Sequence, residues 1–301
     1  MPSFKLFMAY DGYRLPDMAI FRAMEAVAER NGLAIVHAEN DDVIVELGQR
    51  LAAEGKTGPR WLGTMCPSIT EGEAVHRAIA LAQLARARLL VFHISCGEGV
   101  REVKLAKSRG QAVLGEATSQ HLVLTDAVLE DDGFHAQSLA IRPPIRGPEH
   151  QAELWRALAD GALDIVSTDH CPRHALETHH PPGASGIEGR LALVHTFGVR
   201  TGCIGLSRWV EVCCTAPARI FALSRKGMLR PGYDADIVLF DPEKDVTLSP
   251  ETLHSPIGFS SYDGVTVRGF PATTISRGEV IVEGGAFVGA PGRGRFLERS
   301  Y

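Results

Sequence analysis

The stretch Phe4–Tyr10, FKLFMAY, decides the fold, because it places one lysine inside an otherwise apolar run. A run this apolar predicts a buried strand, yet lysine is seldom fully buried without a partner. Lys5 could extend its ammonium group to the rim of a sheet, or serve as a Schiff-base lysine in a desolvated pocket. A lysine deprotonated by burial could also react with carbon dioxide to form a carbamate. That anion has two oxygens and can bridge two metal ions.

Apolar strand-like runs alternate with amphipathic helical stretches along most of the chain. Strands alternating with helices predict parallel βα units. We expect five strands, at 4–10, 33–37, 89–95, 111–118 and 163–169. The helices between them are expected at about 16–30, 41–54, 71–86, 98–109 and 149–158.

The five predicted strands each end in a polar, chemically capable residue: Lys5, His37, His93, Glu116 and Asp169. In a (β/α)₈ barrel the catalytic groups lie at the carboxyl ends of the strands. The sequence therefore predicts an α/β fold that contains about five C-terminal βα units of a TIM-type barrel. Because the chain opens directly on a strand and a closed barrel needs eight, we expect further sequence before it.

The character of the sequence changes after Leu223, where Gly and Pro punctuation and short strand-like runs replace the helical pattern. This pattern is typical of a small β unit. We therefore expect a partial barrel domain over residues 1–223, and a small β domain with a C-terminal tail over residues 224–301.

The composition excludes several classes of partner. The chain has 301 residues, of which 45% are apolar and 22% charged, with a net charge of −5. No basic block predicts a nucleic-acid partner, and no apolar run approaches the roughly 18–20 residues of a membrane span. The six cysteines form no CxxC pair, which favours reduced thiols and a cytoplasmic protein.

His37 and His93 are candidate metal ligands. Either histidine alone could be a core residue with a satisfied hydrogen bond, but two at matching strand ends favour a shared metal ion. Asp169 could cap a turn; directly after a buried strand it could instead ligate a metal and accept a proton from water. We expect His121 and His135 to be structural and the loop 174–180, HALETHH, to be a weaker metal candidate.

Several motifs in fixed order resemble the cyclic amidohydrolases, most closely their dihydropyrimidinase and D-hydantoinase branch. They are SFKLFMAYDG, IVHAEN, VFHISCGEGV, GEATSQHLVLTD, RPPIRG, IVSTDHCP, GIEGR and KGMLRPGYDADIVLFDP, and they cover nearly the whole chain. The resemblance implies a (β/α)₈ barrel with a small β-sandwich. It also implies two divalent metal ions, expected to be zinc, bridged by a carboxylated Lys5. His37 and His93 would hold one ion, and Asp169 would bind the other and act as general base.

The resemblance further implies hydrolysis of a cyclic amide in dihydropyrimidines or hydantoins, with an N-carbamoyl amino acid as product. Tyr10 would donate a hydrogen bond to the oxyanion, although it could be a plain strand-end aromatic residue. Arg142 and Ser185 stand where the family commonly has serine and asparagine, at positions that hold the substrate ring largely through backbone groups. The resemblance also implies a homo-oligomer, expected to be a tetramer.

One departure from the family pattern is the missing His-x-His pair, which occurs nowhere in the 301 residues. The chain is therefore expected to be the C-terminal portion of such an enzyme. Two alternatives remain open: an allantoinase or dihydroorotase, and a non-catalytic dihydropyrimidinase-related scaffold. Retention of Lys5, His37, His93 and Asp169 favours an enzyme over the scaffold.

Overall fold

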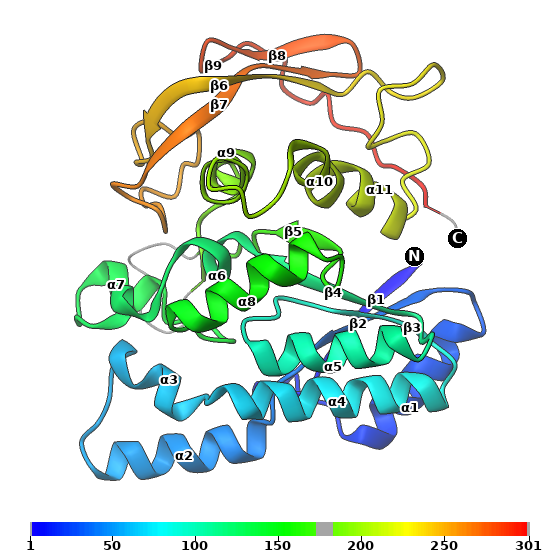
Figure 1. Cartoon of the computed structure of the whole chain (residues 1–301), viewed down its shortest axis with the longest axis vertical. Coiled ribbons are helices and arrows are strands. Elements are labelled where there is room, and N and C mark those ends of the chain that lie inside the picture. Colours follow the sequence, from blue (N-terminus) through cyan, green and yellow to red (C-terminus); the bar gives the residue numbers. More distant parts are fainter. Residues whose placement is uncertain (1, 173–182, 300–301) are drawn as a thin grey trace.

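The computed structural model describes residues 2–172 and 183–299, which form a helix-covered parallel sheet and a separate antiparallel sheet (Figure 1). The parallel sheet has five strands in the order β1-β2-β3-β4-β5. They are β1 (Ser3–Phe7), β2 (Leu33–His37), β3 (Arg88–Val91), β4 (Val113–Thr118) and β5 (Ile165–Ser167). Chain order equals sheet order, as successive right-handed βα units produce. The predicted α/β class and the five strands are thus confirmed.

Five long helices connect or follow these strands and confirm the predicted ones to within about three residues. They are α1 (Asp17–Ala28), α2 (Asp41–Ala53), α4 (Ser68–Leu84), α5 (Gly97–Ser108) and α8 (Pro148–Ala159). The short helices were not predicted: α3 (Leu62–Met65), α6 (Ser119–Val123), α7 (Phe134–Ser138), α9 (Arg190–Val194), α10 (Leu206–Val210) and α11 (Ala216–Ile220). Helices this short span little more than one turn, so they carry no measurable apolar period.

Both faces of the parallel sheet are covered. Helices α1, α4 and α5 pack along one face (Figure 1), where apolar side chains such as Ile20, Val75 and Leu89 are fully buried. On the other face, Leu33 and Leu90 belong to a second cluster that includes residues of α11. Burial on both faces explains why these strands are almost continuously apolar.

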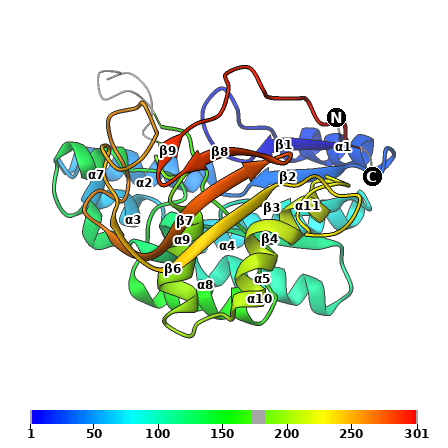
Figure 2. The ribbon, with the colours of Figure 1, turned by 90° about the horizontal axis from the view of Figure 1, so that it is seen from above.

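The antiparallel sheet lies beyond α9 and α10, as Figure 2 shows from above. Its strands are β6 (Ile237–Thr247), β7 (Thr266–Ser276), β8 (Glu279–Glu283) and β9 (Ala286–Phe287). A ring nitrogen of His195, next to α9, donates a hydrogen bond of 2.9 Å to the carbonyl of Arg268 in β7 and ties the sheet to the helices. The predicted boundary at residues 223 and 224 falls between α11 and β6, and it stays a prediction.

Lys5, His93 and Asp169 lie near the carboxyl ends of their strands, with small shifts from the expected positions. Lys5 lies two residues before the end of β1, whereas His93 and Asp169 follow β3 and β5 by two residues. Tyr10, His93 and Asp169 have φ angles of 75°, 40° and 43°. This left-handed region is uncommon for non-glycine residues and concentrates at functional sites.

None of the helices in the described part of the chain has both the length and the apolar character needed to cross a bilayer.

Candidate metal and substrate site

His37 and His93 lie side by side in the interior. Nδ1 of His37 is 3.0 Å from Nε2 of His93, and the side chains are almost completely buried. The other ring nitrogen of His37, Nε2, lies 2.8 Å from the Glu39 carboxylate. Since a carboxylate accepts a hydrogen bond, Nε2 carries the proton and Nδ1 presents a lone pair.

This pair of histidines fits a divalent metal ion. Two imidazole nitrogens bound tetrahedrally to zinc at about 2.0–2.1 Å lie about 3.3 Å apart, close to the 3.0 Å between the two ring nitrogens here. Burial, reinforced by the charge of Lys5, holds the pKa of His93 well below its usual value, so its ring is neutral, the form that binds metals. A carboxylate behind a ligating histidine, here Glu39, is the usual partner in such sites.

Lys5 lies between aromatic rings, with Nζ 4.4 Å from the ring centre of Phe92 and 5.0 Å from that of Phe7. Burial lowers the pKa of Lys5, although the charges of Asp169 and Glu116 oppose the shift. A lowered pKa increases the share of neutral amine, which is the form that reacts with carbon dioxide.

Glu116 of β4 acts on the backbone of His93. One of its carboxylate oxygens accepts the His93 N–H at 3.3 Å. Burial raises the pKa of Glu116 to about 7. This contact holds the backbone of His93 next to β4.

Asp169 is exposed, and its charge acts on both Lys5 and Glu116. Within residues 2–172 and 183–299, no three His, Cys, Asp or Glu side chains converge as a set of metal ligands.

Tyr10 and Arg142, which the sequence predicted to bind substrate, contact each other. The Tyr10 hydroxyl donates a 3.1 Å hydrogen bond to the Arg142 carbonyl. The Arg142 guanidinium lies 4.9 Å from the centre of the Tyr10 ring and donates to Glu39 at 3.2 Å and Asp41 at 3.1 Å. Burial, with the charge of Glu39, raises the pKa of Tyr10, so its hydroxyl stays protonated and able to donate.

Ser185 lies in a turn whose backbone is tied to neighbouring segments. Its N–H donates to the Ser261 hydroxyl at 2.8 Å, and the Ser261 N–H donates to the Ser185 carbonyl at 3.0 Å. The next two N–H groups, of Gly186 and Ile187, both donate to Nδ1 of His170, at 3.2 and 3.3 Å. Burial lowers the pKa of His170, which favours the neutral ring that can accept them.

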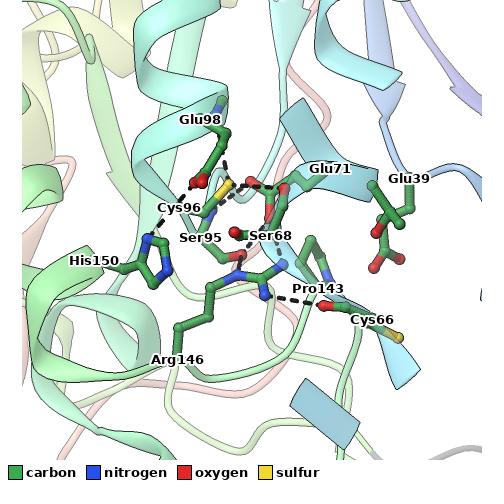
Figure 3. A network of polar contacts seen from close by, with 12 residues as sticks. Glu39, Cys66, Ser68, Glu71, Ser95, Cys96, Glu98, Pro143, Arg146 and His150 are labelled. Carbon is green, nitrogen blue, oxygen red and sulfur yellow. Dashed lines mark hydrogen bonds and ion pairs between the residues drawn. The ribbon is translucent and has the colours of Figure 1, made fainter. Parts of the chain in front are cut away.

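A buried ionic network next to the site was not found from the sequence (Figure 3). Arg146 donates to the hydroxyl of Ser95 at 2.8 Å, the carbonyl of Cys66 at 2.9 Å and the carboxylate of Glu71 at 3.1 Å. Glu71 also accepts the Ser95 N–H at 2.8 Å. Because Ser95 is two residues after His93, this network fixes the segment that carries the histidine. The sequence shows a charged residue in each segment, Arg146 in RPPIRG and Glu71 in α4. It does not show that these two side chains are buried together.

His121 has the structural role predicted for it: it accepts from the Thr118 hydroxyl at 2.7 Å and donates to the Pro143 carbonyl at 3.1 Å. His135 lies in α7, and its carbonyl accepts from the Leu139 N–H. The loop His174–His180 lies outside the described residues.

Comparisons with known proteins agree on one family. The profile of the amidohydrolase family matches residues 5–281. D-hydantoinases of Streptomyces coelicolor and Rhizobium radiobacter are 40% and 39% identical over 99% of the chain. The chain spans 66% and 67% of the length of these two relatives. A dihydropyrimidinase from Brevibacillus agri superposes with a TM-score of 0.96 at 38% identity, over 100% of this chain and 68% of that one. These likenesses confirm the predicted barrel type and the resemblance.

Proposed function

The chain belongs to the amidohydrolase family, and from this premise we propose that it acts in the hydrolysis of cyclic amide C–N bonds. The proposed substrates are dihydropyrimidines and hydantoins, and the products are N-carbamoyl amino acids. Similarity to proteins named D-hydantoinase and dihydropyrimidinase supports this substrate class. The observation that carries the proposal is the 3.0 Å approach of the buried ring nitrogens of His37 and His93.

The proposal includes two divalent ions, zinc by family resemblance, which a carboxylated Lys5 would help to hold. His37 and His93 would hold one ion, and Asp169 would bind the other. When bound, such ions supply Lewis-acid activation of water and of the substrate carbonyl. The chain itself offers the first ion two histidines but offers the second no His-x-His pair.

The remaining steps belong to side chains of this chain. Asp169 accepts a proton from the attacking water and delivers it to the departing ring nitrogen, as a general acid–base group does. The protonated Tyr10 hydroxyl would turn from the Arg142 carbonyl, its present acceptor, and donate to the oxyanion that develops on the ring carbonyl. Arg142 and Ser185 border the ring through their backbone groups, and the Arg142 side chain is already engaged by Glu39 and Asp41.

Two further expectations accompany this function, a homo-oligomer of the tetrameric type and a cytoplasmic location, and both stay predictions. An allantoinase or dihydroorotase would use the same metal chemistry on another ring. A non-catalytic scaffold would bind neither metal nor ring.

The test is ring opening of hydantoin and dihydrouracil by the purified chain supplied with zinc and bicarbonate, in parallel with allantoin and dihydroorotate. We expect ureido products from the first two rings, at a low rate because this chain has no His-x-His pair for the second ion, and none from a His93→Ala variant. Turnover restricted to allantoin or dihydroorotate would replace the proposal by the alternative enzyme. No turnover together with no bound metal would favour the scaffold.

A further inference from the structure

The residue after Asp169 has no role in the proposed chemistry, but it contacts the turn that carries Ser185. We propose that His170 is a positioning residue, which fixes the substrate-side turn 185–188 against the segment that carries Asp169. This inference rests on the proposed function only in calling that turn the substrate side.

The contact is unusual because one ring nitrogen accepts hydrogen bonds from two successive backbone N–H groups. Nδ1 of His170 accepts the N–H of Gly186 at 3.2 Å and that of Ile187 at 3.3 Å. A ring nitrogen that accepts hydrogen bonds carries no proton, so the hydrogen is on Nε2. The hydrogen-bonding capacity of these two backbone N–H groups is therefore satisfied by a side chain and not by water or by other backbone groups.

Further contacts show that the two segments run together. The Cys171 N–H donates to the Ala184 carbonyl at 3.1 Å, one residue beyond His170 and one before Ser185. On its own side, the His170 N–H is 3.2 Å from the Thr168 hydroxyl. The ring of His170 is therefore fixed at its base by the strand end, and its Nδ1 faces the turn.

The opposite side of the turn is closed by Tyr262. A Cβ atom added at Gly186 would lie 2.6 Å from Cε2 of Tyr262, so the turn backbone is in close contact with that ring. Tyr262 is buried, and its hydroxyl donates to Ser119 at 2.8 Å. With Tyr262 buried on one side and Ser261 bonded to Ser185, the hydrogen bonds to His170 add the contacts that join the turn to the segment of Asp169.

The experiment compares His170→Asn, whose side-chain oxygen can accept the same N–H groups, with His170→Leu, which accepts none. His170→Phe replaces the leucine variant if that does not fold. The matched control is His150→Leu, since Nδ1 of His150 accepts a different loop amide, that of Gly97, at 3.2 Å. Amide hydrogen exchange at 185–188 and 96–99 is measured in all variants.

We expect exchange at Gly186 and Ile187 to be about tenfold faster in the leucine variant and within about twofold of wild type in the asparagine variant. The control should accelerate exchange at 96–99 and leave 185–188 unchanged. Unchanged exchange in the leucine variant, or equal acceleration in both His170 variants, would overturn the proposal.

The second readout is steady-state kinetics with hydantoin. We expect the leucine variant to raise KM about fivefold with a smaller change in kcat, and the asparagine variant to restore KM. An unchanged KM in an active leucine variant would contradict the positioning role. The wild-type chain could open none of the rings while amide hydrogen exchange at 185–188 changes as expected in the His170 variants. In that case the proposed function is wrong, and the positioning of the turn by His170 is still supported.

Discussion

Nδ1 of His37 lies 3.0 Å from Nε2 of His93, although 56 positions separate the two residues. They meet because β2 and β3 are adjacent parallel strands that end at the same edge of the sheet. Since Nε2 of His37 donates its hydrogen bond to Glu39 on the far side, Nε2 of His93 is the donor to Nδ1 of His37. For both rings to offer a lone pair to a metal ion, the proton of His93 would have to move from Nε2 to Nδ1, because a neutral imidazole keeps one ring proton.

The first prediction concerns Glu39, which contacts no proposed metal ion itself. Glu39→Gln should weaken zinc binding about 10- to 100-fold, because the carboxylate orients His37 and raises the basicity of its ring. His93→Ala removes a ligand and should weaken binding further. The affinity is measured by competition with a chromogenic chelator. His76→Ala, at an exposed histidine on α4, is the control and should bind as wild type; equal affinities of Glu39→Gln and wild type would contradict the role of Glu39.

The sequence was sufficient to predict the strands, the long helices and the convergence of His37 with His93. The reason is geometric: the carboxyl ends of adjacent parallel strands meet, whatever the loops between them do. The same rule brought Lys5, Glu116 and Asp169 to one edge of the sheet.

Contacts that depend on the path of a loop could not be predicted. Arg142 meets Glu39 across 103 positions, and His170 meets backbone groups rather than side chains. Backbone N–H and C=O groups are the same for nearly every residue type, so the sequence does not indicate which of them a side chain will bind by a hydrogen bond. Burial of Arg146 was hidden for a related reason, because charged residues are exposed by default.

The second prediction concerns the buried network of Arg146. Arg146→Met should lower the free energy of unfolding by about 3–5 kcal/mol, because it leaves Glu71 buried without its counter-charge. Adding Glu71→Gln to this variant should recover part of the loss. Urea unfolding measures all three proteins.

The control for this prediction is Arg101→Met, which breaks an exposed ion pair with Glu153 at 3.3 Å. Exposed pairs contribute about 0–1 kcal/mol, so the control should unfold close to wild type. Equal losses in the two methionine variants would show that the Arg146 network is not responsible.

The third prediction is a pH dependence at His254. The hydrogen bond to Glu188 raises the pKa of His254 above its ordinary 6.5, and the second ring nitrogen donates to the Gly285 carbonyl. A raised pKa of a base means that the stabilisation is complete below about pH 6.5 and is lost as pH rises through the pKa of the folded state. His254→Leu should therefore reduce the melting temperature more at about pH 5.5 than at about pH 9.

Glu188→Gln tests the cause of this pH dependence, because it keeps the shape of the side chain and removes its charge. When His254→Leu is introduced into the Glu188→Gln variant, the melting temperature should change by about the same amount at both pH values. A pH-independent effect of His254→Leu in the wild-type chain would instead mean that packing, and not the charge, accounts for the contribution of His254.

The last prediction concerns the close approach of the turn to Tyr262. Gly186→Ala should destabilise the fold by about 1–3 kcal/mol, the usual cost of inserting a methyl group into a packed contact, because the new Cβ would lie 2.6 Å from the Tyr262 ring. Combining it with Tyr262→Leu should add less than the sum of the two single losses, since the residues are in direct contact. Gly63→Ala in α3, with no atom within 4 Å of the added Cβ, is the control and should be neutral or stabilising. Urea unfolding measures the free energy of unfolding of all these variants. Strictly additive losses of this free energy in the double variant would show that Gly186 and Tyr262 do not pack against each other.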